Sequence, residues 1–287
     1  MPGYLIGGAA LALVTALPLA WKWQLGIPRA SIYVLAVSML VAVALTLVGR
    51  AVAFDAVSWT LAMWVTTVVV AAAGLLIVFF RDPERPVPER QDVIVSPADG
   101  QVVYVRPVEP HQFPVADKRG RTCTLRELAG TTLGNGDVTA IGISMNLSDV
   151  HVNRAPAGGR VRILEHVGGT FGSLRDPEMV LTNERVTTVI EDGDLEIAVV
   201  QIASRLVRRI VSFVSKGDVL HLGQRMGAIR FGSQVDLIVP ARAQIRLTVQ
   251  AGDRVVAGQT IVALVSTEHG GAVTAGSTGK AVGSGRH

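Results

Sequence analysis

Three short stretches of the sequence bring together residue types that chemistry often needs. They are Ser96–Gly100 (SPADG), Asp149–Pro156 (DVHVNRAP) and Met226–Asp236 (MGAIRFGSQVD). In the second stretch, His151 lies beside Asn153 and Arg154 at the edge of a β-type run. A histidine in this setting could act as a general base, or the three side chains could bind a phosphate. These stretches are the candidates for a functional site.

Each stretch also has a purely structural interpretation. Asp99 stands between Ala98 and Gly100 in a turn sequence, where an aspartate commonly caps its own backbone. A single histidine such as His151 is more often structural than catalytic. The Gly232–Ser233 pair, taken alone, is typical of a turn before a strand. The stretches therefore need the context of the whole chain.

The composition narrows the classes of protein. Of 287 residues, 49% are hydrophobic and only 17% are charged, which excludes disorder as the main state. Aromatic residues make up 5%, so stacking platforms for nucleic acid are not expected. Cys123 is the single cysteine, which excludes an intramolecular disulfide and a multi-cysteine metal site. No metal is expected, because His111, His166, His221 and His269 show no ligand spacing.

Residues 1–80 differ from the rest of the chain. They contain three basic residues and one acidic residue, out of 27 and 23 in total. Three uncharged apolar runs lie here: Tyr4–Trp21, Ile32–Val48 and Trp59–Phe80. A spanning helix needs about 20 apolar residues, so the third run qualifies outright, and the first two could instead pair as a short hairpin. We predict three transmembrane helices; a buried helical core of a soluble protein is the alternative.

The basic residues predict how these helices are oriented. Lys22 and Arg29 lie between the first and second runs, and Arg81 and Arg85 follow the third. By the positive-inside rule, the first loop and the domain after residue 81 face the cytoplasm. We therefore expect a protein of the inner (cytoplasmic) membrane with its soluble part on the cytoplasmic side.

The soluble part is predicted to be mainly β. Short runs rich in Val and Ile alternate with glycine turns, which is typical of strands. The predicted strands are Asp92–Val95, Gln101–Val105, Val138–Met145, Arg160–His166, Thr187–Ile190, Glu196–Ile202, Ile210–Val214, Gln234–Val239, Ile245–Val249 and Thr260–Val265. Short helices are predicted at Thr124–Ala129 and Ser204–Arg208.

An internal repeat runs through this β region. The segment from Val214 through Gly217-Asp218 to Gly223-Gln224 has the same internal spacing as the segment that starts at Val249. A weaker pair is Pro97–Val102 and Pro156–Val161. The pattern resembles the two halves of a biotinyl/lipoyl-like barrel-sandwich hybrid, so we predict a duplicated or interleaved pair of such sheets. A lipoyl carrier is excluded because no lysine stands in a suitable hairpin between the halves.

Five motifs in order resemble one family of enzymes. They are FFRDPER from Phe79, SPADG, DVHVNRAP, Asn183-Glu184-Arg185 and GAIRFGSQVD. Together they are similar to the phosphatidylserine decarboxylase proenzymes, closest to the short prokaryotic-type branch that includes archaetidylserine decarboxylases. The resemblance extends from about Phe79 to Val265. Gln234 stands where the commonest cleavage motif of the wider family has threonine.

The resemblance implies that the chain processes itself. The Ser233 hydroxyl would attack the carbonyl of Gly232, His151 would take the proton, and Asp99 would orient and stabilise the imidazolium. Elimination would then convert residue 233 to a pyruvoyl group, which is the implied cofactor. The products would be a β chain, 1–232, and an α chain, 233–287.

The resemblance also implies the reaction. The pyruvoyl carbonyl would form a Schiff base with the amine of phosphatidylserine, and loss of carbon dioxide would yield phosphatidylethanolamine. His151 would return the proton, while Asn153, Arg154 and Phe231 are the expected substrate-binding residues. The expected partners are a membrane phospholipid and the two chains of the cleaved protein, not nucleic acid; a homodimer is left open.

The chain is therefore divided into 1–80 (transmembrane helices), 81–265 (catalytic domain) and 266–287 (disordered tail). Three alternatives to the decarboxylase remain. A membrane-anchored barrel-sandwich adaptor and a paralogue that no longer matures would both stay uncleaved. A hydrolase would keep Ser233 as serine, although no G-x-S-x-G elbow is present.

Overall fold

A computed structural model provides the three-dimensional view. It describes residues 2–23, 25–48, 55–90, 92–108, 115–116, 122–123, 137–169, 183–203, 210–229, 233–242 and 244–266. The helices predicted at Thr124–Ala129 and Ser204–Arg208 lie outside these residues, as does the tail from residue 267 onward.

The three apolar runs form three long helices. They are α1 (Pro2–Lys22), α2 (Ile27–Val48) and α3 (Ala56–Phe79). Each is long and apolar enough to cross a membrane. Ile6, Met39 and Ile77 are each at least 70% exposed, although such side chains are usually buried in water-soluble proteins. The prediction of three apolar helices is confirmed, and lipid rather than water is the natural surrounding of these side chains.

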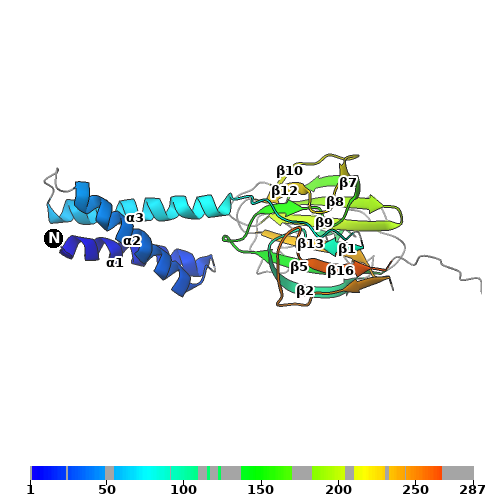
Figure 1. Ribbon diagram of the computed structural model, residues 1–287, viewed down its shortest axis with the longest axis horizontal. Helices are drawn as coiled ribbons and strands as arrows, with labels where there is room; N and C mark the ends of the chain where they lie inside the picture. The colour runs from blue at the N-terminus through cyan, green and yellow to red at the C-terminus, as the bar shows by residue number, and fades with distance from the viewer. Residues whose placement is uncertain are drawn as a thin grey trace, which may run out of the picture.

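Polar contacts set the start of α3 and link it to its neighbours. Asp55 caps α3 by accepting a hydrogen bond from the Ser58 N–H at 2.7 Å. The Tyr33 hydroxyl of α2 donates to the Ala71 carbonyl of α3 at 3.0 Å. Figure 1 shows that α3 runs from the far end of the helical part to the β region, so that its C-terminal end meets the β strands.

The main sheet has eight strands in the order β11-β7-β8-β9-β13-β5-β2-β15, and all pairs are antiparallel. The strands are β2 (Gly100–Val108), β5 (Val138–Met145), β7 (Gly159–Val167), β8 (Arg185–Asp192), β9 (Leu195–Ala203), β11 (Val219–Leu220), β13 (Ser233–Pro240) and β15 (Arg254–Val255). The sheet is curled, and β13 lies at its centre (Figure 1).

Three smaller sheets accompany it within the described residues. One has the order β1-β16-β14, with β1 (Val93–Val95), β16 (Ile261–Val265) and β14 (Ile245–Leu247). Another has the order β10-β12-β6, with β10 (Ile210–Ser212), β12 (Arg225–Ile229) and β6 (Val152–Arg154). The last is the pair β3 (Val115–Ala116) and β4 (Thr122–Cys123).

The sequence repeat corresponds to a structural duplication. Gly217 and Gly252 have φ values of +98° and +100°, and their N–H groups donate to the Val161 and Val102 carbonyls at 2.7 and 2.8 Å. Only glycine adopts this backbone readily. The order β15-β2-β5-β13 is matched by β11-β7-β8-β9, and β1-β16-β14 is matched by β6-β12-β10. The continuous half, 152–229, is thus inserted between β5 and β13 of the other half.

The observed strands agree with most of the predicted ones and differ in detail. The predicted strands at Ile210–Val214 and Ile245–Val249 end two residues earlier, at Ser212 and Leu247. Six short strands were not predicted: β3, β4, β6, β11, β12 and β15. The mainly β class and the duplication are confirmed, whereas the closer likeness to a barrel-sandwich hybrid stays a prediction.

Candidate active site

His151 lies in the short connection between β5 and β6, and this connection is held in a fixed turn. The Asp149 N–H donates to the Asn146 carbonyl at 2.9 Å, and the Asn146 N–H donates to Asp149 Oδ2 at 2.7 Å. Arg254 donates to the second carboxylate oxygen, Oδ1, at 2.7 Å. On the other side, the Ile229 N–H donates to the His151 carbonyl at 3.1 Å. The main chain around His151 is therefore fixed from both sides.

The imidazole of His151 is oriented by a main-chain carbonyl. Nδ1 lies 2.9 Å from the Asp149 carbonyl oxygen. Because a carbonyl only accepts, Nδ1 carries the hydrogen and Nε2 keeps a lone pair when the ring is neutral. Nε2 is buried and has no hydrogen-bond partner among the described residues. A buried Nε2 with a free lone pair is suited to accept a proton.

The protonation state follows from the surroundings. The residue is 3% exposed, and burial lowers the pKa of His151 to about 4. The hydrogen bond to Asp149 and the negative charges of Asp149 and Asp99 act in the opposite direction, and the positive charge of Arg81 adds to the lowering. The ring is therefore neutral at pH 7, which is the form a general base requires.

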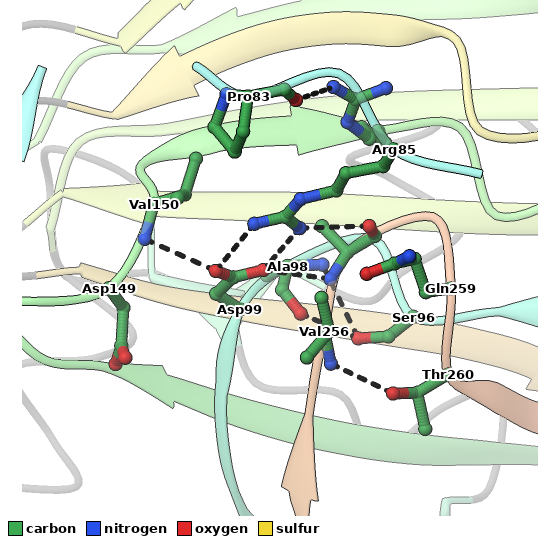
Figure 2. A network of polar contacts seen from close by, with 12 residues as sticks. Pro83, Arg85, Ser96, Ala98, Asp99, Asp149, Val150, Val256, Gln259 and Thr260 are labelled. Carbon is green, nitrogen blue, oxygen red and sulfur yellow. Dashed lines mark hydrogen bonds and ion pairs between the residues drawn. The ribbon is translucent and has the colours of Figure 1, made fainter. Parts of the chain in front are cut away.

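The Asp99 carboxylate is buried within a network of four hydrogen bonds (Figure 2). Oδ1 accepts from Arg85 Nη1 at 2.5 Å and from the Ala257 N–H at 2.8 Å. Oδ2 accepts from Arg85 Nη2 at 2.8 Å and from the Val150 N–H at 3.3 Å. Burial acts to raise the pKa of Asp99, but Arg85 and the two N–H groups outweigh it and hold the pKa below its usual value.

The orienting role expected for Asp99 stays a prediction, and its contacts show what else this carboxylate does. The resemblance implies that Asp99 orients the imidazole, but the ring contact among the described residues is to the Asp149 carbonyl. Arg85 occupies both oxygens of Asp99, since a guanidinium and a carboxylate form a strong two-point pair. Asp99 also holds the main chain next to His151, through the Val150 N–H, and adds its negative charge.

Asn153 and Arg154 are buried and hold parts of the chain together. The Asn153 Oδ1 accepts from Gln201 Nε2 at 2.7 Å, and Asn153 is 0% exposed. Arg154 donates to the Gly223 carbonyl at 3.1 Å and to the Pro83 carbonyl at 3.0 Å, and it is 4% exposed. Both side chains form contacts inside the protein, and the substrate-binding role expected for them stays a prediction.

Ser233 is the first residue of the central strand. Its main chain is paired with Met145 of β5 on one side and with Ala203 of β9 on the other. Ile229, four residues earlier, is bonded to His151. Four Cα–Cα steps span at most about 15 Å, so the His151 segment and Ser233 belong to the same region. Phe231 and Gly232, which were predicted as site residues, lie outside the described residues.

The sequence motifs predicted no role in the site itself for three residues that lie near it. Arg85 pairs with Asp99, the Asp149 carbonyl orients His151, and the Phe79 ring lies with its centroid 4.1 Å from that of His151. Arg85 and Phe79 both belong to the FFRDPER motif, which was the available signal. Within the described residues, no group of three or more His, Cys, Asp or Glu side chains is arranged to hold a metal ion.

Comparison with known proteins assigns the family. A sequence model described as "Phosphatidylserine decarboxylase" matches residues 73–263. A phosphatidylserine decarboxylase proenzyme of Erythrobacter litoralis is 39% identical over 247 residues, covering 85% of this chain and 90% of the relative. One of Symbiobacterium thermophilum is 38% identical over 201 residues, covering 69% and 83%.

The match extends to an archaeal relative. A Methanocaldococcus jannaschii protein, provisionally named an archaetidylserine decarboxylase proenzyme, is 37% identical over 203 residues, covering 70% of this chain and 96% of the relative. The family model covers the β region that holds His151, Asp99 and Ser233. The chain is therefore a decarboxylase that belongs to the phosphatidylserine decarboxylase family.

Proposed function

We propose that the protein is a proenzyme that cleaves itself between Gly232 and Ser233 and then converts phosphatidylserine to phosphatidylethanolamine and carbon dioxide. The observation that carries the proposal is the state of His151. Its ring is buried and neutral, and its Nε2 lone pair has no partner among the described residues. The proenzyme names of the relatives support both the cleavage and the substrate.

In the first step, His151 Nε2 accepts the proton of the Ser233 hydroxyl. The Ser233 oxygen bonds to the Gly232 carbonyl carbon, the Gly232–Ser233 amide bond breaks, and the released nitrogen takes up the proton. The result is an ester between the two residues. The pairing of β13 with β5 and β9 supports this step, because it holds the main chain of residue 233 in place while the bond is exchanged.

In the second step, the ester is eliminated. The α-proton of residue 233 is removed, the C–O bond breaks, and the carboxylate of Gly232 leaves as the new C-terminus of the 1–232 chain. Water then replaces the nitrogen of the dehydroalanine at position 233, ammonia leaves, and a pyruvoyl group remains at the start of the 233–287 chain. No external oxidant or reductant is needed, because elimination and hydrolysis are both redox-neutral overall.

The residues present fit a pyruvoyl group at position 233. When present, this group supplies an electrophilic carbonyl that can take up an amine and the electron pair left by departing carbon dioxide. The protein supplies a fixed backbone at residue 233 and a buried, neutral base at His151. In our proposal His151 also returns the proton to the product, since its pKa allows it to exchange protons without staying charged.

The helices support a position of this chemistry near the lipid. Since α3 ends at Phe79 and His151 contacts Phe79, the candidate site lies next to the end of an apolar helix that is long enough to cross a membrane. We propose that residues 1–80 hold the catalytic region, 81–265, at the inner membrane. The positions of Lys22, Arg29 and Arg81 support a cytoplasmic catalytic region.

The test is decarboxylation of a defined lipid. The purified protein is added to mixed vesicles that contain phosphatidylserine labelled in the serine carboxyl group, and labelled carbon dioxide and phosphatidylethanolamine are measured. We expect both products from the native protein, in equal amounts, and neither from Ser233→Ala or His151→Gln. Carbon dioxide release by Ser233→Ala, or none by a native protein that has been cleaved, would contradict the proposal.

A further inference from the structure

The last residue of α3 packs on the candidate base. Phe79 ends the helix and is 2% exposed. Its ring centroid lies 4.1 Å from the centroid of His151, and the two ring planes meet at 36°. The apolar helix α3 and the histidine of the β region are thus in direct contact, although 72 positions separate Phe79 and His151 in the sequence.

The imidazole needs a second constraint besides its hydrogen bond. The bond from Nδ1 to the Asp149 carbonyl fixes one edge of the ring, but the ring can still swing about that contact. The Phe79 ring lies against the imidazole and limits this motion, because two packed rings cannot pass through each other. The same contact removes water from the imidazole, which disfavours the charged form.

The end of α3 is itself anchored to the loop that carries His151. Arg81 donates to the Val78 carbonyl of α3 at 3.1 Å through Nη1 and to the Ser148 carbonyl at 2.8 Å through Nη2. The Phe80 N–H continues the helical bonding to the Leu76 carbonyl at 2.9 Å. The position of Phe79 relative to His151 is therefore set by a side-chain bridge and not by ring packing alone.

We propose that Phe79 is a positioning residue that sets the orientation of the His151 imidazole, so that a membrane-crossing helix completes the active site of the β region. The effect on catalysis rests on the proposed function, whereas the contact and its effect on His151 do not. The charged groups that act on His151 are Asp149 on its own loop, Asp99 after β1, and Arg81 after α3.

The first arm of the test measures self-cleavage in three variants. Phe79→Ala removes the ring, Phe79→Leu keeps an apolar side chain without a flat face, and Ile77→Ala is the control. Ile77 belongs to the same helical turn and is 73% exposed. We expect Phe79→Ala to cleave about 10- to 100-fold more slowly at pH 7, as is usual when a catalytic group loses its orientation.

The pH dependence separates orientation from a general loss of structure. Cleavage slows in acid when His151 becomes protonated, and the pH of half-maximal rate reports the His151 pKa. In Phe79→Ala, this pH should move from about 4 toward the ordinary value of about 6.5, because water reaches the ring. In Phe79→Leu, this pH should stay low, while the rate at pH 7 is still below that of the native protein. If Phe79→Ala does not fold, Phe79→Leu decides: a rate equal to that of Ile77→Ala overturns the proposal.

The second arm does not depend on cleavage. The His151 titration is followed by NMR of ¹³C-labelled histidine in the uncleaved Ser233→Ala protein, and His151→Gln assigns the signal. We expect the His151 pKa to rise when Phe79→Ala is added and to stay unchanged when Ile77→Ala is added. An unchanged pKa in the Phe79→Ala protein would overturn the proposal. A native protein that is never cleaved would contradict the proposed function but leave this titration to decide the role of Phe79.

Discussion

Breaking the buried pair formed by Arg85 and Asp99 should be one of the most destabilising single changes in the β region. Their side chains are only 7% and 12% exposed, and Arg85 provides two of the four hydrogen bonds of the carboxylate. Arg85→Met would leave Asp99 buried with no cation on it. Removing one partner of a buried ion pair usually costs about 3–5 kcal/mol. We therefore expect a large loss of stability at pH 7.

The loss can be measured as a shift in melting temperature. For a region of this size, 1 kcal/mol corresponds to about 2–4 °C, so a loss of about 3 kcal/mol predicts a decrease of about 6–12 °C. The measurement is thermal unfolding by circular dichroism in the uncleaved Ser233→Ala background. Because the pKa of Asp99 is lowered in the folded state, the pair stabilises above the unfolded value of about 3.9, and its contribution is lost as the pH falls through the folded value. The effect of Arg85→Met should therefore shrink in acid.

A double-mutant cycle provides the strict test. Adding Asp99→Asn to Arg85→Met should recover part of the lost stability, because the uncompensated charge is removed. Arg90→Met is the matched control, since the Arg90–Asp92 pair is exposed (58% and 39%) and should contribute little. If the Arg85 and Asp99 substitutions are simply additive, or if Arg85→Met melts like Arg90→Met, the buried pair does not stabilise the fold as we argue.

Three further predictions follow from other parts of the β region. Burial raises the pKa of Asp236, so ionisation of this carboxyl destabilises the fold as the pH rises. Asp236→Asn should therefore raise the melting temperature at pH 7. A melting temperature below that of the native protein would contradict this prediction. A Cβ at Gly100 would overlap the Ser144 carbonyl, whereas one at Gly193 would meet no atom within 4 Å. Gly100→Ala should therefore prevent folding and cleavage, while Gly193→Ala should lower the free energy of unfolding by only about 1–2 kcal/mol. Equal losses of stability in the two variants would contradict this prediction. After cleavage, the 233–287 fragment should stay bound to the remainder during size-exclusion chromatography, because it contains the central strand β13; separate elution would contradict this.

The sequence predicts the elements that depend on local pattern. The three helices are found close to their predicted bounds, because continuous apolar runs identify them without knowledge of neighbours. α2 begins five residues earlier than its apolar run because Pro28 fits in the first turn of a helix. The strand Val138–Met145 has the predicted bounds, since its pattern is rich in β-branched residues.

Short strands that form only by pairing with other strands were not predicted from the sequence. β12 has the sequence RMGAI, with a single β-branched residue, and it is a strand because β6 and β10 pair with it. β6 itself has only three residues. Strands of this kind gain their hydrogen bonds from segments distant in the sequence, so no local pattern identifies them.

In the candidate site too, some residues are predicted by local motifs, whereas some contacts depend on the fold. His151, Asp99 and Ser233 are predicted as site residues because their motifs stand in a family order. The contact of Arg85 with Asp99 could not be read from the sequence, because it depends on the path that residues 81–90 take across the β region. The role of the Asp149 carbonyl was hidden for another reason: a main-chain group has no residue-specific signal.

The measurement that tests the proposed cleavage most directly is the intact mass of the denatured protein. Native protein and Ser233→Ala are purified in parallel from membranes and compared by mass spectrometry. For a chain of 30.3 kDa, cleavage before Ser233 gives fragments of roughly 24.5 and 5.8 kDa, adjusted for the modified residue. We expect both fragments in the native sample, a carbonyl-reactive N-terminus on the smaller one, and only the intact chain in Ser233→Ala. A single intact species in both samples, with the protein folded, would contradict the self-cleaving decarboxylase.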